Sequence, residues 1–208
     1  MDYTSEFQQQ AEYMRDYGFN PYSQRLNIAV PNARERLMAG LHYFLGDKAK
    51  WLDCYDELAD WLTDNKGRGL LCIGTCGLGK TLLCQNILPV LIHQHTRVVP
   101  EACTANEMNS KVDRLQDERC VIVDDLGVEA PETNTYGNRR FPFNELCDAA
   151  ERHGSMLIIT TNLRTTHKID PQTHQAIPSI EDRYGIRTLD RLRAITKVVV
   201  FSGDSMRG

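Results

Sequence analysis

The chain has 208 residues, of which 41% are hydrophobic and 25% are charged, and its formal net charge is −4. This composition is that of a globular protein with a sizeable core, and it excludes a disordered chain, a collagen-like repeat and a small disulfide-stabilised domain. The acidic balance argues against a purely electrostatic nucleic-acid binder. The charge is nevertheless uneven: residues 183–208 contain six Lys and Arg against two Asp, a net of +4, so residues 1–182 sum to −8.

The first ten residues contain neither a basic segment nor an apolar one, so we expect no secretory signal. The most apolar stretches, 87–92 and 156–159, are far shorter than the ~20 residues of a membrane span, so no membrane partner is expected. The seven cysteines are odd in number and scattered, which is typical of buried free thiols in a reducing compartment. Cys72 and Cys76 are not followed by a second Cys or His pair at zinc-finger spacing. We therefore expect a soluble cytoplasmic protein without a zinc site.

Helical patterning dominates the first third of the chain, and an alternation of strands and helices follows. Helices are expected at 4–17, 33–45, 51–63, 80–91, 105–116, 143–153 and 179–193, and strands at 70–73, 97–100, 120–123, 156–160 and 197–201. Trp51, Tyr55 and Trp61 share one expected helix, and we expect them to pack onto the core. Short, continuous apolar strands between helices are typical of a parallel sheet covered on both faces. The predicted fold is α/β: a helical arm in residues 1–65, a candidate partner-binding region, followed in residues 66–208 by a core with a five-stranded parallel sheet between helices.

A glycine-rich turn after the first expected strand carries the strongest chemical signal. The segment fits the G-x-x-x-x-G-K-[ST] pattern of a phosphate-binding loop and opens a helix. Its residues are Gly74, Thr75, Cys76, Gly77, Leu78, Gly79, Lys80 and Thr81, and Leu82 follows them as a further expected nucleotide contact. Backbone N–H groups of such a turn surround phosphates, and the helix N-terminus adds positive partial charge. We expect Lys80 to reach the β- and γ-phosphates of ATP and the Thr81 hydroxyl to bind Mg²⁺.

Two adjacent carboxylates follow the expected strand at 120–123. Asp124 is the expected Mg²⁺ residue, and Asp125 is the candidate base that orients or deprotonates the attacking water. Glu129, with its longer side chain, competes with Asp125 for that role. Paired acids at a strand end also occur as plain helix or turn caps, but the preceding phosphate-binding loop favours the catalytic interpretation.

Polar and basic residues complete the set of candidates. Asn162 follows the expected strand at 156–160, where an amide can hydrogen-bond the γ-phosphate and the attacking water; the alternative is an ordinary strand-end turn. Arg187 and Arg191 stand four residues apart and share one helical face if 179–193 is a continuous helix. An arginine supplied by a neighbouring subunit stabilises transition-state charge in other NTPases. The alternative is salt bridging to nearby acidic residues, which we expect first for Arg183 and Arg193.

The order of these motifs resembles that of the AAA+ ATPases. The chain carries Gly-x-x-x-x-Gly-Lys-Thr, then hydrophobic-Asp-Asp-Leu-Gly, then Ile-Ile-Thr-Thr-Asn, and then Tyr-Gly-x-Arg-x-x-Asp-Arg-Leu. Together with a Gly-x-Ser-x-Arg ending, this order is most similar to DnaC-type replicative helicase loaders and IstB-type transposition helpers. The resemblance covers about residues 55–208.

The resemblance implies a role for each motif. It implies that residues 74–81 are Walker A, that Asp124 and Asp125 are Walker B, and that Asn162 is sensor 1. It further implies that Arg191 is the arginine finger, with Arg187 as the second candidate, in an ATPase that uses Mg²⁺ and forms a homo-oligomer on binding ATP.

The chain departs from the AAA+ pattern in two ways. Most AAA+ proteins have Glu in place of Asp125, which predicts slow hydrolysis, and no helical lid follows the last strand, an absence shared with the loader clade. Arg207 is a candidate replacement for the lid arginine.

The expected partners are a replicative helicase and single-stranded DNA, or a transposase if the chain is a transposition helper. Arg139, Arg140 and Phe141 combine basic and aromatic groups as single-stranded DNA sites do, although such a triplet is more often a plain surface feature. A P-loop small-molecule kinase and a non-hydrolysing adaptor are the alternatives from other classes. With Arg191 and Arg187 aimed at the ATP of a neighbouring subunit, the basic end of the chain is interpreted as a subunit interface rather than as a DNA-binding tail.

Overall fold

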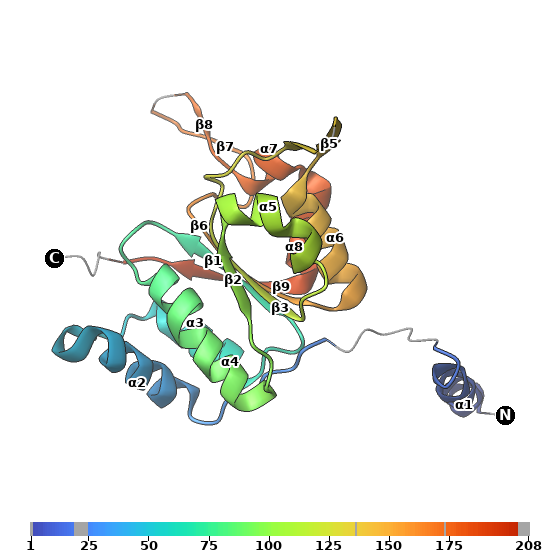
Figure 1. The fold of residues 1–208 in the computed structure, drawn as a ribbon. Helices are drawn as coiled ribbons and strands as arrows, with labels where there is room; N and C mark the ends of the chain where they lie inside the picture. Colours follow the sequence, from blue (N-terminus) through green and yellow to red (C-terminus); the bar gives the residue numbers. More distant parts are fainter. Residues whose placement is uncertain (1, 19–24, 136, 173, 204–208) are drawn as a thin grey trace.

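A computed structural model describes residues 2–18, 25–135, 137–172 and 174–203 (Figure 1). Its helices are α1 (Tyr3–Arg15), α2 (Ala33–Leu45), the 3-10 helix η1 (Gly46–Lys48), α3 (Cys54–Thr63), the π-helix η2 (Leu82–Ile87), α4 (Leu88–Thr96), α5 (Ala105–Leu115), α6 (Pro142–His153), α7 (Ile180–Tyr184) and α8 (Ile186–Ile195). Its strands are β1 (Gly69–Gly74), β2 (Glu101–Thr104), β3 (Cys120–Leu126), β4 (Thr133–Thr135), β5 (Asn138–Arg140), β6 (Met156–Thr161), β7 (Lys168–Ile169), β8 (Ala176–Ile177) and β9 (Thr196–Phe201).

Five parallel strands form the central sheet, in the order β2-β3-β6-β1-β9. β6 therefore lies between β3 and β1, and its Ile159 pairs with Val123 on one side and with Leu71 on the other. The predicted α/β fold with a five-stranded parallel sheet is confirmed. In such sheets ligands bind outside the carboxyl ends of the strands, and the segments that follow β1, β3 and β6 meet at that edge.

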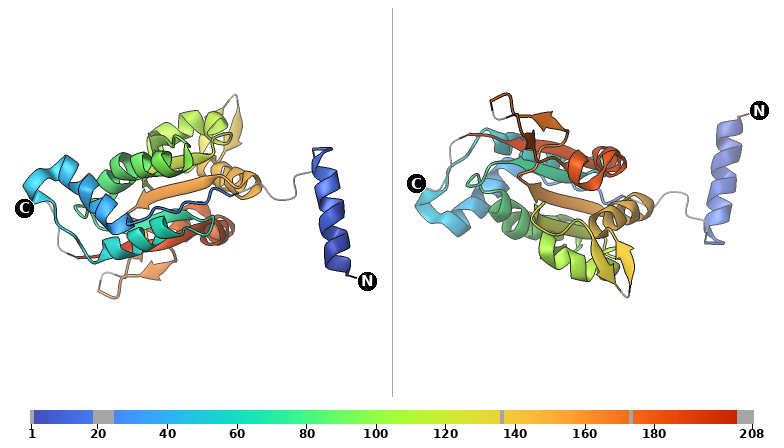
Figure 2. Two further views of the ribbon diagram at one scale, coloured as in Figure 1. Left: turned by 90° about the horizontal axis from the view of Figure 1, so that it is seen from below. Right: turned by 90° about the horizontal axis from the view of Figure 1, so that it is seen from above.

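Helices cover both faces of this sheet (Figures 1 and 2). Alternate residues of β1 point into different cores: Leu70 and Cys72 pack with α2, α3 and α4, while Leu71 packs with α5, α6 and α8. The three central strands β1, β3 and β6 are covered on both faces and consist largely of continuous apolar runs, which is the pattern from which the fold was predicted.

Residues of the predicted N-terminal arm take part in the first of these cores. Tyr55 and Trp61 of α3 are fully buried, and Trp51 is half-buried. The Trp61 indole N–H donates to the backbone oxygens of Arg68 and Gly69 at the start of β1 (2.9 and 3.1 Å). The predicted packing of these aromatic side chains onto the core is confirmed. The division into an arm at 1–65 and a core at 66–208 stays a prediction.

The second strand lies four residues later than predicted. α4 continues to Thr96 and is capped by Arg97 in the left-handed conformation (φ +62°), so 97–100 is a connection and β2 spans Glu101–Thr104. Val99 in this connection is 71% exposed, whereas Cys103 of β2 is buried. The prediction was wrong because the Val-Val pair imitates a buried strand, while β2 is an edge strand with few apolar residues.

The helix expected at 179–193 is broken at Gly185. With φ +87°, this glycine ends α7 and precedes α8, so Arg183 belongs to α7 whereas Arg187 and Arg191 share α8. The helix expected at 80–91 runs on to Thr96 and contains the π-helical turn η2, a feature that often marks functional sites. The hairpins β4-β5 and β7-β8 were not predicted.

Across the described ranges, no helix is long and apolar enough to cross a membrane. All seven cysteines are free thiols, as expected; six are buried and Cys76 is exposed. Burial raises the pKa of the Cys103 thiol to about 11 and that of Cys120 to about 12, so both stay protonated at neutral pH. Ser205 and Arg207 of the Gly-x-Ser-x-Arg ending lie outside the described residues.

Candidate nucleotide-binding site

The glycine-rich turn joins β1 to the helix formed by η2 and α4. Gly77 and Gly79 have φ values of +93° and +76°, a left-handed conformation that glycine adopts without steric cost. Gly74 lies so close to β9 that a Cβ at this position would meet a backbone oxygen at 2.2 Å. Leu78 is buried, and its backbone oxygen accepts a hydrogen bond from the Tyr55 hydroxyl of α3 (3.0 Å). α3 and β9 therefore hold the turn in place.

Lys80 occupies the inside of this turn. Its Nζ donates to Gly74 O (2.7 Å), to Thr75 O (2.8 Å) and to Asn162 Oδ1 (3.1 Å). Only 6% of the residue is exposed, and this burial lowers the pKa of Lys80. Phosphate oxygens are strong acceptors for a desolvated ammonium group and carry the negative charge that these neutral partners lack. The turn is therefore suited to bind an anion.

The two residues predicted to hold Mg²⁺ are in contact. The Thr81 hydroxyl donates to Asp124 Oδ1 (3.2 Å) at the end of β3, and the same oxygen accepts from the Thr160 hydroxyl of β6 (2.5 Å). A hydroxyl and a carboxylate fit Mg²⁺, which prefers hard oxygen ligands and is commonly held by one or two protein groups beside phosphates and water. Within the described ranges, no cluster of three or more His, Cys, Asp or Glu side chains offers an alternative metal site.

Asp125 leaves the regular path of β3. Its φ is +56°, a left-handed conformation that is uncommon outside glycine but tolerated best by Asp and Asn. The register of β3 against β6 shifts between Val123 and Leu126, and the Asp125 N–H donates to the Thr160 hydroxyl (2.9 Å) instead of continuing the ladder. As a result Asp125 is exposed and lines a cavity of about 280 Å³ in front of the turn.

This cavity brings most of the predicted site residues together. It is lined by Leu45, Lys48, Cys76, Gly77, Gly79, Lys80, Thr81, Leu82, Asp125 and Asn162. Asn162 contacts the glycine-rich turn at two places: its Oδ1 accepts a hydrogen bond from Lys80, and its Nδ2 donates one to Cys76 Sγ (3.6 Å). A larger and mostly apolar groove of about 480 Å³ between α2 and α4 contains none of the predicted site residues. Most predicted site residues therefore line the smaller cavity, while Gly74, Thr75 and Asn162 line another cavity of about 450 Å³.

Glu129, the competitor of Asp125 for the attacking water, contacts other groups of the chain. Its carboxylate is completely buried and accepts hydrogen bonds from the Gly127 N–H (2.8 Å) and from the Tyr184 hydroxyl. The guanidinium of Arg183 lies 3.9 Å from the same carboxylate. Burial, together with the hydrogen bond to Glu129, raises the pKa of Tyr184. Glu129 does not line the cavity, and we infer that it supports the loop after β3 against α7.

The two carboxylates are therefore expected to respond differently to substitution. Asp125→Asn should lower ATP hydrolysis by about 10²–10⁴-fold, the usual contribution of a general base, and leave nucleotide affinity intact. Glu129→Gln should leave hydrolysis nearly unchanged but lower the free energy of unfolding by about 1–3 kcal/mol, because it weakens buried hydrogen bonds to a charged acceptor. Phosphate release and urea unfolding measure the two effects. A stable Glu129→Gln variant without hydrolysis would instead make Glu129 the catalytic carboxylate.

The two candidate finger residues of α8 differ in their surroundings. Arg187 is exposed, and no ion pair to it is seen among the described residues. Arg191 pairs with two carboxylates of α6, Asp148 (2.6 Å) and Glu151 (3.0 Å). Arg193 forms an expected salt bridge, to Asp190 of the same helix (3.9 Å). The stronger pairing of Arg191 was not expected, because its partners lie about 40 residues earlier in the chain, on another helix.

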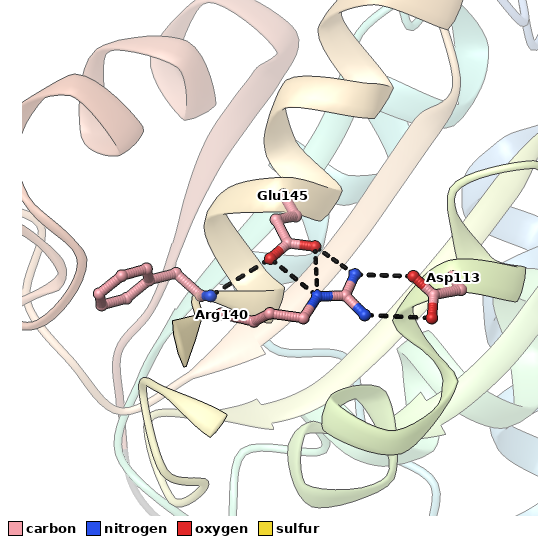
Figure 3. Close-up of polar contacts among 4 residues, drawn as sticks. Asp113, Arg140 and Glu145 are labelled. Carbon is pink, nitrogen blue, oxygen red and sulfur yellow. Dashed lines mark hydrogen bonds and ion pairs between the residues drawn. The ribbon is translucent and has the colours of Figure 1, made fainter. Parts of the chain in front are cut away.

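The side chains of the basic and aromatic triplet at 139–141 contact other residues of the chain. Arg140 lies between two carboxylates and donates to Asp113 (2.7 and 3.1 Å) and to Glu145 (2.5 and 3.2 Å), as Figure 3 shows. These hydrogen bonds raise the pKa of Arg140 and lower that of Asp113. Arg139 pairs with the glutamate that precedes β4 (2.6 Å) and lies over the Phe141 ring. Both guanidinium groups are paired with carboxylates, which favours a plain surface feature over a single-stranded DNA site.

Sequence reasoning missed two residues that support the site. Tyr55 holds the backbone of the glycine-rich turn from α3, and Thr160 contacts both Asp124 and Asp125. Thr160 could have been found from the sequence, because it is a polar residue in an otherwise apolar strand. Tyr55 has no comparable signal, because the pattern of its helix predicts only packing.

Comparisons with known proteins concern the fold. No protein-family model matches the chain, and no curated protein sequence matches it. Similar solved structures include the DnaI (18% identity, TM-score 0.48, covering 85% of this chain and 86% of that one) and the DnaC helicase loader (13%, 0.48, 84% and 93%). Another is described as a primosome component from Streptococcus pyogenes serotype M3 (13%, 0.48, 84% and 82%). At 18% identity or less, these likenesses concern the fold alone.

Proposed function

We propose that the chain binds ATP together with Mg²⁺ at the turn after β1 and hydrolyses it to ADP and phosphate. One observation carries this proposal: three strand ends meet, with Lys80 after β1 contacting Asn162 after β6, and Thr81 contacting Asp124 of β3. An ammonium, an amide, a hydroxyl and a carboxylate at one edge of the sheet are the groups that phosphoryl transfer requires. In that reaction positioning and charge stabilisation supply almost all of the catalysis.

Each of these residues has a definite task in the proposal. Lys80 exchanges its carbonyl acceptors for phosphate oxygens and stabilises the charge that develops on them. Thr81 and Asp124 hold Mg²⁺, which neutralises phosphate charge when it is bound. Asp125 accepts a proton from the attacking water, and Asn162 orients that water beside Lys80. The short Asp125 side chain reaches less far than a glutamate would, so we expect hydrolysis to be slow.

We further propose that a second copy of the chain completes the site. No arginine is among the residues that line the cavity in the described part of the chain. Arg191, with Arg187 as the second candidate, is then the group that a neighbouring copy supplies to the γ-phosphate. This arrangement makes hydrolysis depend on assembly, and it explains why a basic segment follows an acidic body.

In the cell we propose a role as a DNA-replication accessory factor that loads or regulates a replicative helicase on single-stranded DNA. The motif order supports this role, above all the Tyr-Gly-x-Arg-x-x-Asp-Arg-Leu segment. This segment spans the break between α7 and α8, and the hydroxyl of its Tyr184 donates a hydrogen bond to Glu129 in the loop after β3. An IstB-type transposition helper would use the same site with a transposase as its partner. Only the partner separates the two roles.

ATP hydrolysis measured with and without single-stranded DNA, alongside native mass with ATP and with ADP, tests the proposal. We expect slow hydrolysis that single-stranded DNA or a helicase accelerates, and assembly beyond the monomer with ATP only. Stimulation by small metabolites but not by DNA would indicate a P-loop small-molecule kinase. ATP binding without hydrolysis, even in a single turnover, would indicate a non-hydrolysing adaptor.

A further inference from the structure

One buried hydroxyl contacts both acidic residues of the site. Thr160 lies in β6, next to β1 and β3, and is completely inaccessible to solvent. Its Oγ1 donates a hydrogen bond to Asp124 Oδ1 (2.5 Å) and accepts one from the Asp125 N–H (2.9 Å). The hydroxyl has one proton and two lone pairs, so it can serve both partners at once.

The contact with Asp125 maintains an unusual backbone. Because β3 leaves its regular register after Val123, the Asp125 N–H has no partner in the strand ladder and is satisfied by Thr160. A left-handed conformation outside glycine is strained and persists only where the surroundings enforce it. Without the hydroxyl, the backbone that exposes Asp125 to the cavity loses the partner that stabilises it.

The contact with Asp124 fixes the direction of a buried carboxylate. Asp124 Oδ1 receives two hydroxyl donors, and the contact with Thr160 (2.5 Å) is shorter than the one with Thr81 (3.2 Å). Hydrogen bonds to ligating carboxylates hold them in the orientation that a metal needs, and losing such a partner typically costs 10–100-fold in metal affinity or activity.

We propose that Thr160 is a positioning residue that aims Asp124 at Mg²⁺ and Asp125 at the attacking water through a single hydroxyl. This inference rests on the proposed ATPase function and adds a residue to it. A valine has nearly the shape of threonine but neither donates nor accepts a hydrogen bond, whereas a serine keeps the hydroxyl. The two substitutions therefore separate the hydrogen bonds from the packing.

The test compares Thr160→Val with Thr160→Ser and with Thr196→Val. Thr196 is a matched control, because it is equally buried in the same sheet and its hydroxyl donates to Leu192 O (2.6 Å), with no contact to the site. For each variant we measure the dissociation constant of a fluorescent ATP analogue in Mg²⁺ and in EDTA, the Mg²⁺ concentration for half-maximal binding, and urea unfolding. If Thr160→Val does not fold, Thr160→Ala takes its place.

We expect Thr160→Val to bind the analogue normally in EDTA but to need at least about tenfold more Mg²⁺, as loss of a partner behind a metal ligand predicts. Thr160→Ser and Thr196→Val should keep the wild-type Mg²⁺ response. If Thr160→Val or Thr160→Ala has the same Mg²⁺ response as Thr196→Val, Thr160 is only structural and the inference is wrong, while the ATPase proposal stands. If the wild-type chain itself fails to bind the analogue, the ATPase proposal fails and this inference with it.

Discussion

Lys80→Ala is expected to weaken ATP binding by about 10–100-fold, because hydrogen bonds to charged groups contribute about 1.5–3 kcal/mol each. In the structure the Lys80 ammonium lies inside the glycine-rich turn, and its Nζ already contacts the loop backbone and Asn162. Hydrolysis should fall further than affinity, since the charge on the phosphate oxygens grows in the transition state. Titration with a fluorescent ATP analogue and steady-state phosphate release measure the two losses.

Lys197→Ala is the matched control for this substitution. Lys197 Nζ also donates to a backbone oxygen, Glu57 O (3.0 Å), but it comes from β9 and does not line the cavity. We expect this variant to bind and hydrolyse ATP as the wild type does. Because burial disfavours the charged form of Lys80 and lowers its pKa, removing that cation should not destabilise the fold. Comparable losses in the two variants would contradict the assignment of Lys80.

The part of the site that the sequence predicted is the part fixed by local chemistry. The phosphate-binding turn needs glycines at positions of positive φ and a lysine directly before the helix, and Gly77, Gly79 and Lys80 satisfy both needs within a few residues. The carboxyl ends of parallel strands lie at one edge, so Asp124 and Asn162 were predicted to converge there once their strands were recognised. Hydrophobic pattern and spacing were sufficient for this part.

The residues that hold the site together could not be predicted in the same way. Thr160, Tyr55 and Glu129 act through contacts with partners 35, 23 and 55 residues away in the sequence. Which side chains meet over such distances depends on strand order and register, and the order β2-β3-β6-β1-β9 is not encoded in any local pattern. The same reason explains the missed pairing of Arg191 with α6.

The basic end of the chain can now be examined residue by residue. Arg183 pairs with Glu129 and Arg191 pairs with Asp148 and Glu151, so part of the +4 charge is neutralised by the acidic body of the same chain. The two ion pairs of Arg191, whose carboxylate partners are about two-fifths exposed, contribute about 0–1 kcal/mol each. An arginine finger contributes about 10³–10⁵ in rate, or roughly 4–7 kcal/mol. Arg191 would therefore gain by exchanging its carboxylate partners for a γ-phosphate.

Arg191→Ala is accordingly expected to lower ATP hydrolysis by about 10³-fold or more while leaving ATP affinity nearly unchanged. The double variant Asp148→Asn with Glu151→Gln controls for the lost ion pairs, since it removes the same contacts from the other side and keeps the arginine. This control should hydrolyse ATP at least as fast as the wild type, because Arg191 no longer has to leave charged partners. Phosphate release, ATP-analogue titration and urea unfolding on the three proteins separate the two roles.

Mixing two inactive variants decides whether Arg191 acts across subunits. Lys80→Ala chains keep Arg191 and Arg191→Ala chains keep Lys80, so an interface between them contains one complete site if the arginine comes from the neighbour. In a random equal mixture with a head-to-tail interface, about a quarter of the interfaces are of this kind, and hydrolysis should recover to about that fraction of the wild-type rate. Recovery should need ATP-dependent assembly and should vanish on dilution below the assembly concentration. A mixture that assembles but stays as inactive as its components would place the action of Arg191 within its own chain.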